Sequence, residues 1–155
     1  MNLFIISVSQ RTNQQLTAAD ALILITPEWA SMASPLLKNL LLMCASEGTG
    51  HKPTLLVLVV NGISGANPIV EFNMNAFKNN KLVTIPDHLI IRNVEQVINE
   101  ICADHDRLTT RGSSIRQRIA YSLHVLKHYA VAYKTLRLAL TSPPFVNEQA
   151  YAYGM

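Results

Sequence analysis

Two polar loops in this 155-residue chain each follow an apolar run and are candidates for ligand binding. The loop Pro27–Met32 follows the apolar run Ala21–Ile25 and combines a carboxylate, an indole and two small residues. The loop Asn61–Gly65 follows the apolar run Thr54–Val60, and its glycines allow the backbone to approach a planar ligand closely. Because open α/β sheets bind ligands where their strands end, we expect both loops at the binding edge of such a sheet.

A third polar segment follows the apolar run Leu3–Ser7 and suits a phosphate group. Ser9 and Arg11, with Asn13 beside them, offer hydroxyl and guanidinium groups and backbone N–H groups, which are suitable donors to phosphate oxygens. An ordinary solvated turn is the alternative interpretation of this segment.

Buried strands are expected to position these loops. Continuous apolar runs, typical of strands covered on both faces of a parallel sheet, predict four strands: Leu3–Ser7, Ala21–Ile25, Thr54–Val60 and Lys81–Pro86. The run His88–Ile91 either extends the fourth strand or forms an apolar connector. Pro27 is expected to end the second strand, since it cannot donate a hydrogen bond to a neighbouring strand and it restricts Thr26 to extended geometry.

Helices are expected between and after the strands. Four are predicted: Leu36–Glu47, Asn67–Asn79, Asn93–Asp104 and Ile115–Leu140. Ser34 and Pro35 suit the start of the first helix, and Asn93 with Gln96 resembles a capping box. Gly112-Ser113-Ser114 is expected to break the chain before the last helix. In that helix apolar residues recur every three or four positions and are expected to pack on the sheet: Ile115, Ile119, Leu123, Leu126, Ala130 and Tyr133.

Three short motifs, in this order and spacing, resemble the NAD(P)H-dependent FMN reductase family: Ala19-Asp20-Ala21, Pro27-Glu28-Trp29 and Leu37-Lys38-Asn39. The resemblance covers about residues 3–90 and implies an α/β, flavodoxin-like three-layer sandwich with a parallel sheet. It also implies an enzyme that binds FMN and uses NAD(P)H as co-substrate. Hydride would pass from NAD(P)H through the flavin to a small-molecule acceptor, namely a quinone, a free flavin, an azo compound or a metal oxyanion.

The resemblance assigns the flavin contacts to three groups of residues. The FMN phosphate is expected to contact Ser9, Arg11 and Asn13. One side of the flavin ring is expected to contact Pro27, Glu28, Trp29, Ala30, Ser31 and Met32. The other side is expected to contact Asn61, Gly62, Ser64 and Gly65. No catalytic residue and no metal ligand is expected, because a flavin carries its own hydride chemistry. Glu28 is interpreted as orienting the loop backbone, and Trp29 either as a flavin-edge aromatic or as an interface residue.

The chain departs from the family pattern in ways that favour a second hypothesis. The family usually has other residues at four positions: Val8, Gln14, Ala30 and Leu42. Family members also have a helix, a strand and usually another helix before the strand at Ala21, whereas only the 13 residues Val8–Asp20 intervene here. We therefore expect one helix–strand unit to be missing after the first strand, near residues 12–16. The alternative function is a flavodoxin-like scaffold or interaction protein that has lost tight flavin binding.

Composition excludes several other classes. Hydrophobic residues make up 49% of the chain and charged residues 15%, which argues for one well-packed domain, residues 1–141, followed by a tail, residues 142–155. The net charge of +3 is not gathered in a basic run, so no nucleic-acid partner is expected. No apolar run approaches the ~20 residues of a membrane helix. Two cysteines outside any CxxC spacing, Cys44 and Cys102, favour a reduced, cytoplasmic protein.

Two further expectations concern assembly and metal binding. The resemblance implies a homodimer or homotetramer, for which the apolar segment Leu36–Cys44 would suit the interface. His124 and His128 are four residues apart on the predicted last helix, a spacing that can ligate zinc. The sequence indicates no third ligand, so these histidines, like His105, are interpreted as surface or packing residues. A small nucleotide-binding regulator has no distinguishing motif here.

Overall fold

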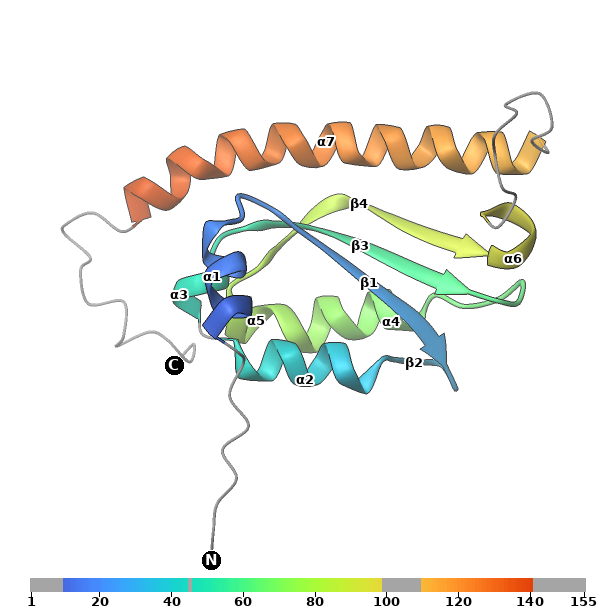
Figure 1. Ribbon diagram of the computed structural model, residues 1–155, viewed down its shortest axis with the longest axis horizontal. Helices are drawn as coiled ribbons and strands as arrows, with labels where there is room; N and C mark the ends of the chain where they lie inside the picture. Colours follow the sequence, from blue (N-terminus) through green and yellow to red (C-terminus); the bar gives the residue numbers. More distant parts are fainter. Residues whose placement is uncertain (1–9, 45, 99–109, 141–155) are drawn as a thin grey trace, which may run out of the picture.

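The computed structural model describes residues 10–44, 46–98 and 110–140 and has three layers. A four-stranded sheet lies between the long helix α7 on one face and a layer of shorter helices on the other (Figure 1). The strands are β1 (Leu22–Trp29), β2 (Met32–Ala33), β3 (Pro53–Val60) and β4 (Val83–Arg92), and their order in the sheet is β2-β1-β3-β4. β1, β3 and β4 are parallel, and only the short β2 is antiparallel. The predicted α/β, flavodoxin-like sandwich is therefore confirmed.

Eight helical segments complete the described chain. They are α1 (Gln10–Ala18), α2 (Pro35–Met43), α3 (Ser46–Thr49), α4 (Asn67–Glu71), η1 (Phe72–Ala76), α5 (Phe77–Asn80), α6 (Val94–Val97) and α7 (Thr110–Leu140). None of these described helices is both long enough and apolar enough to cross a membrane. The predicted strand Leu3–Ser7, Cys102, His105 and the tail from residue 142 lie outside the described residues.

The sheet has an apolar core on each face, because successive side chains of a strand point to opposite sides. On the face covered by α2 and α4, Leu56 and Leu58 of β3 pack with Phe72. On the face covered by α7, Leu55 and Val57 pack with Leu126. β3 is the central strand and is buried along nearly its whole length, as predicted.

Among the described strands, β1 lies at the edge of the sheet along Leu22–Pro27, and two predictions about it are corrected. It continues through Pro27 to Trp29, and Pro27 pairs in register with Val59. Proline is tolerated there because an edge strand has no further neighbour that needs its N–H. Ile23 and Ile25 are 45% and 61% exposed, although burial on both faces was expected. α7 packs on β3 and β4, and no described strand pairs with the outer edge of Leu22–Pro27.

β4 extends well past the predicted end at Pro86. Thr84 pairs with Thr54 and His88 with Leu56, so the three intervening residues of β4 stand opposite one residue of β3. Pro86 lies in this bulge, where its missing N–H breaks no ladder hydrogen bond. The extension through Ile91 is thus the correct interpretation, and it carries Arg92 to the carboxyl edge of the sheet.

The helix after Asn67 contains a π turn that the sequence pattern did not predict. Phe72 and Phe77, five residues apart, are both buried, and their ring centroids are 6.1 Å apart. A π turn brings positions i and i+5 to the same face, so both rings reach the core. Glu71 meanwhile faces the loop that precedes α2.

Four predicted helix boundaries are wrong. α2 ends at Met43 rather than Glu47, and α4 begins after an N-cap at Ala66 rather than Asn67. Asn93 is left-handed, with φ 50°, and makes no side-chain cap hydrogen bond, so no capping box forms. α7 begins at Thr110, and Gly112 is a buried helical residue instead of a break.

One predicted packing residue of α7 is also wrong. Leu123, expected to face the sheet, is 42% exposed.

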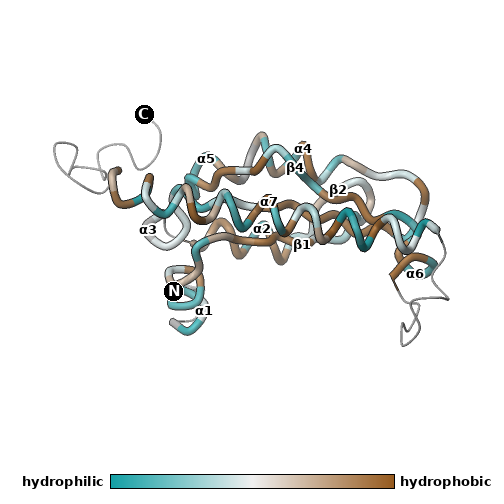
Figure 2. Tube along the Cα trace, turned by 90° about the horizontal axis from the view of Figure 1, so that it is seen from above, coloured by the Kyte–Doolittle hydropathy of each residue, from teal (hydrophilic) through white to brown (hydrophobic). Residues whose placement is uncertain are grey.

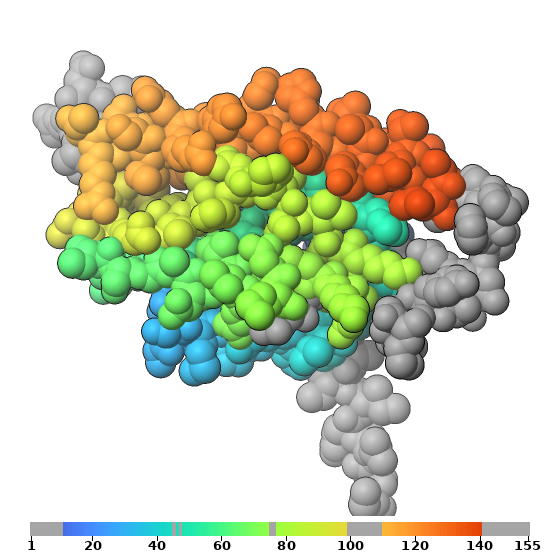
Figure 3. Space-filling view, turned by 180° about the vertical axis from the view of Figure 1, so that it is seen from behind, coloured from blue at the N-terminus to red at the C-terminus, as the bar shows by residue number. Residues whose placement is uncertain are grey.

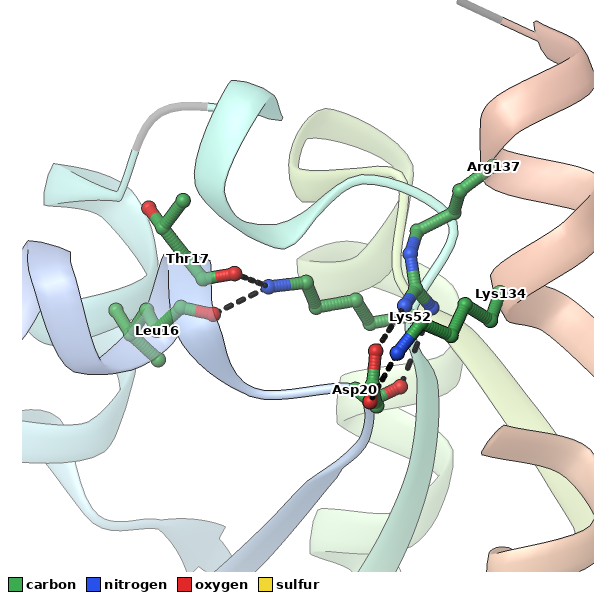
Figure 4. Close-up of polar contacts among 6 residues, drawn as sticks. All are labelled: Leu16, Thr17, Asp20, Lys52, Lys134 and Arg137. Atoms are coloured by element: carbon green, nitrogen blue, oxygen red, sulfur yellow. Dashed lines mark hydrogen bonds and ion pairs between the residues drawn. The ribbon is translucent and has the colours of Figure 1, made fainter. Parts of the chain in front are cut away.

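Helix α1 lies at the amino edge of the sheet (Figures 1 and 2). Lys52, at the start of β3, is buried and donates from Nζ to the carbonyl oxygens of Leu16 and Thr17, which end α1 (Figure 4). Burial lowers the pKa of Lys52, and the charge of Arg137 lowers that pKa further. Asp20 accepts from Arg137 at 2.6 Å and pairs with Lys134 at 3.4 Å. These contacts attach α1 and the end of α7 to the same edge.

Candidate functional site

A strained hairpin forms the first part of the site. β1 and β2 are joined by only two residues, Ala30 and Ser31, whose φ angles are 48° and 64°. Positive φ at both positions is the pattern of a type I′ turn, which normally uses asparagine and glycine. The hairpin leaves Trp29 and Met32 exposed by 64% and 54% at the carboxyl edge. Strain of this kind is often found at ligand sites and points to a functional role.

Two buried contacts fix the hairpin in this position. The hydroxyl group of Thr26 donates to the carbonyl oxygen of Pro27 at 2.9 Å and accepts from the N–H of Ser34 at 2.9 Å. Glu71 accepts from the N–H of Ala33 at 2.9 Å and forms an ion pair with Lys38 at 2.8 Å. The hydrogen bond from Lys38 and then that from the Ala33 N–H lower the pKa of Glu71, so its carboxylate is ionised at neutral pH.

The loop Asn61–Gly65 is locked onto the hairpin through Glu28. Gly65 has φ 111°, and a Cβ atom there would lie 2.4 Å from Oε2 of Glu28. The Glu28 side chain thus occupies the space beside Gly65, and its Oε2 is buried without a hydrogen bond to any described residue. Only glycine fits at position 65, because both the φ angle and the close approach exclude a side chain.

The end of β4 holds the same loop from the other side. Nη2 of Arg92 donates to the carbonyl oxygen of Gly65 at 2.9 Å. The backbone N–H of Asn93 donates to the carbonyl oxygen of Gly62 at 3.0 Å. Three parallel strands therefore end in one connected group of loops, with the exposed side chains of Trp29 and Met32 beside it.

The structure brings together two of the three groups of predicted site residues. Pro27–Met32 and Asn61–Gly65 meet at the carboxyl edge, as expected from their places after β1 and β3. Arg11 and Asn13 do not join them, because they lie on α1 at the amino edge, the full length of β1 away (Figure 1). Eight strand residues span about 26 Å. Ser9 lies outside the described residues.

The reason for this separation is the short connection before β1. The predicted polar loop is helix from Gln10 onward, and this helix leads directly into the amino end of β1. No strand lies between Gln10 and Asp20, so Arg11 and Asn13 cannot return to the carboxyl edge. The prediction that these two residues join the ring-side loops is therefore corrected.

Three residues of the site were not singled out in the sequence. The position of Arg92 at the site could have been predicted, because Arg92 follows the apolar run that extends the fourth strand to the carboxyl edge. Thr26 and Glu71 had none, since their hydrogen bonds reach Ser34, eight residues along the chain, and Ala33, 38 residues away.

Comparison with known proteins agrees with this architecture. Residues 8–96, more than half of the chain, match the family described as NADPH-dependent FMN reductase. The chain belongs to the NADPH-dependent FMN reductase family. An X-ray structure of an oxidoreductase from Corynebacterium diphtheriae has the same fold, with a TM-score of 0.63 and 16% sequence identity. The match covers 79% of this chain and 62% of that one, so the chain spans less than two thirds of that neighbour's length.

The described residues of this FMN reductase family member fit the ring of a flavin rather than its phosphate. Trp29 and Met32 offer apolar surface, Gly62 and Gly65 allow close backbone approach, and Oε2 of Glu28 is a buried acceptor without a partner. The residues predicted to hold the phosphate are either at the opposite edge or outside the described chain. Ring binding thus has structural support that phosphate binding lacks.

Proposed function

We propose that this chain is an FMN-binding oxidoreductase that takes hydride from NAD(P)H and reduces a small-molecule acceptor, namely a quinone, a flavin, an azo compound or a metal oxyanion. The observation that carries the proposal is the pair of loops interlocked by Glu28 and Gly65 at the carboxyl edge, in a chain that belongs to the FMN reductase family. Ligands of open α/β sheets bind at this edge.

The residues of the site would bind and orient the ring. Trp29 and Met32 would cover its apolar surface and exclude water, while the Ala30–Ser31 turn and the glycines of the second loop would present backbone groups to its polar rim. Bound FMN supplies the hydride-transfer chemistry. Arg92 would act on the ring only through the loop that it holds, by way of its hydrogen bond to Gly65.

Assembly into a homodimer or homotetramer is part of the proposal. Leu36 and Leu42, near the two ends of α2, are 79% and 80% exposed and would give a partner subunit apolar surface on the outer side of this helix. A partner subunit on this face would bury them.

Two glycine variants test the proposed ring site. FMN is titrated into the purified chain, binding is followed by quenching of flavin fluorescence and by absorbance near ~450 nm, and NADPH oxidation is measured with a quinone acceptor. Gly65→Ala is expected to weaken FMN binding at least about tenfold, because its Cβ displaces Glu28 or the loop. Gly48→Ala, in α3 and far from the carboxyl-edge loops, is the matched control, since a Cβ there meets only Oγ1 of Thr17, at 3.3 Å.

A folded wild-type chain that binds no added FMN would contradict the proposal. It would favour the second candidate, a flavodoxin-like scaffold or interaction protein without tight flavin binding. The specific observation that favours this candidate is the position of Arg11 and Asn13 at the amino edge, away from the ring-side loops.

A further inference from the structure

The outer face of α7 carries a stripe of exposed side chains that contains no lysine or arginine. The helix has 31 residues, about 46 Å, and packs on the sheet through its inner face, where Ser122 and Leu126 are buried. Five exposed residues at alternating spacings of three and four define the outer stripe: Tyr121, His124, His128, Val131 and Thr135. This spacing places them along one line opposite the sheet. Figure 3 shows α7, coloured orange to red, along the top of the molecule.

The middle of the outer stripe holds a pair of histidines. The rings of His124 and His128 lie edge to face, with centroids 4.5 Å apart, and both side chains are exposed. Two histidines four residues apart on a helix can bind one metal ion together. The described residues contain no group of three or more histidine, cysteine, aspartate or glutamate side chains, and α7 has no acidic residue. One chain thus supplies two imidazole ligands of the four that Zn²⁺ prefers.

A second copy of the chain would supply the other two imidazole ligands of the zinc ion. The midpoint of α7 is Val125 and the midpoint of the histidine pair is Leu126, so two antiparallel helices with facing histidine pairs overlap along almost their full length. Tyr121 and Val131, which flank the pair and are 55% and 68% exposed, then become buried between the helices. Positive charge borders the seam, because Arg118 lies 5.3 Å from the centroid of the Tyr121 ring and Lys127 is exposed on the flank of the stripe. This charge disfavours pairing of the two helices without the metal.

We infer that the outer stripe of α7 pairs with the same stripe of a second copy, and that His124 and His128 of the two chains form a four-imidazole site for Zn²⁺. The site links self-association to a divalent transition metal. It is separate from the carboxyl-edge loops and does not depend on flavin binding.

Sedimentation velocity over a range of protein concentrations, in EDTA and in ZnCl₂, tests this inference with the full chain. Zinc is expected to tighten chain association, because four imidazoles bind the metal more tightly than the two of a single chain. At a zinc concentration about a hundred times the Kd of the paired form and still below the Kd of the single chain, the increase is about a hundredfold. Equilibrium dialysis should give one zinc ion per two chains at this site. The double variant His124→Ala/His128→Ala should lose both effects, while His88→Ala, an exposed histidine on β4, should keep both.

Equal association constants in EDTA and in zinc would overturn the inference. Zinc binding without tighter association, or a zinc effect that survives in His124→Ala/His128→Ala, would also overturn it. Circular dichroism of each variant establishes that the fold is retained, since both substituted side chains are exposed.

Discussion

At the scale of single residues, the turn at Ala30 and Ser31 stands out because neither residue suits it. Both have positive φ angles, which cost a residue with a Cβ atom about 1 kcal/mol or more. The surrounding contacts of Thr26 and Glu71 hold the turn in place against this cost. Strain is therefore balanced by buried hydrogen bonds beside the site.

The double substitution Ala30→Asn/Ser31→Gly should relieve that strain. Asparagine and glycine are the residues that a type I′ turn prefers, so we expect the free energy of unfolding to rise by about 1 kcal/mol. Urea unfolding followed by tryptophan fluorescence measures the change. An unchanged or lower stability would show that the turn is not strained.

Glu71 predicts a defined pH dependence. Its pKa is lowered from an ordinary value near 4.5, chiefly by the hydrogen bond from Lys38 and then by that from Ala33. Below the ordinary value the unfolded chain binds more protons at this position than the folded chain, so its contribution to stability is complete above that pH and is lost as pH falls through the folded pKa. Glu71→Gln should therefore be less stable than wild type at pH 7, and the difference should shrink below about pH 4.5.

Thermal unfolding of both proteins from pH 7 to pH 3 makes this comparison. Glu95→Gln, which changes an exposed carboxylate on α6, is the matched control and should stay parallel to wild type. A Glu71→Gln curve that also stays parallel would contradict the prediction.

At the scale of elements, the attachment of α1 depends on Lys52. The buried ammonium group satisfies the last carbonyl groups of α1, which a helix end otherwise leaves without partners. Arg137 and Lys134 hold Asp20 next to it, so α1, β1 and α7 meet at one edge (Figure 4).

Lys52→Met should detach α1 without disturbing β3. Methionine keeps most of the buried volume but leaves two carbonyl groups unsatisfied, a loss of about 1–3 kcal/mol that the removal of a buried charge partly offsets. Hydrogen exchange over Gln10–Ala18 should become faster while exchange in Pro53–Val60 stays slow. Lys78→Met, which changes an exposed lysine on α5 outside this group of contacts, is the control and should leave both segments unchanged.

Elements with a strong local signal were predictable and those that depend on distant contacts were not. The parallel sheet was predictable from the apolar runs at β1 and β3. The ring side of the site was predictable from the polar loops that follow these runs. The bulge in β4 and the π turn at Phe72–Ala76 depend on which residues fit the core, so periodicity alone missed them. Arg11 was misplaced because a Ser-x-Arg pattern does not reveal whether its segment forms a loop or a helix.

At the scale of the whole molecule, the outer edge of β1 is unpaired among the residues that the structure describes. Ile23 and Ile25 are exposed there, and no described strand uses the outer hydrogen-bonding groups of Leu22–Pro27. An apolar, unpaired edge strand is a template for association with another chain.

Ile25→Lys should reduce self-association in the absence of zinc. A lysine on an edge strand opposes pairing with a second strand, and its effect on the free energy of unfolding should remain within about 0.5 kcal/mol because Ile25 is 61% exposed. Light scattering over a concentration series measures the change. Val70→Lys, on α4 and 55% exposed, is the control, and an equal effect of the two variants would contradict a special role for the edge.

The close contact between the Glu28 side chain and Gly65 also has a consequence for the kinetics of ligand binding. Glu28 fills the space beside the Asn61–Gly65 loop, and Arg92 and Asn93 form hydrogen bonds to the same loop from the end of β4, so this loop is held from both sides. A ligand that enters such a site meets groups that are already ordered and loses little conformational entropy from the protein. Ligand binding should follow a single exponential, and its observed rate constant should increase linearly with ligand concentration. No slower conformational step should follow binding.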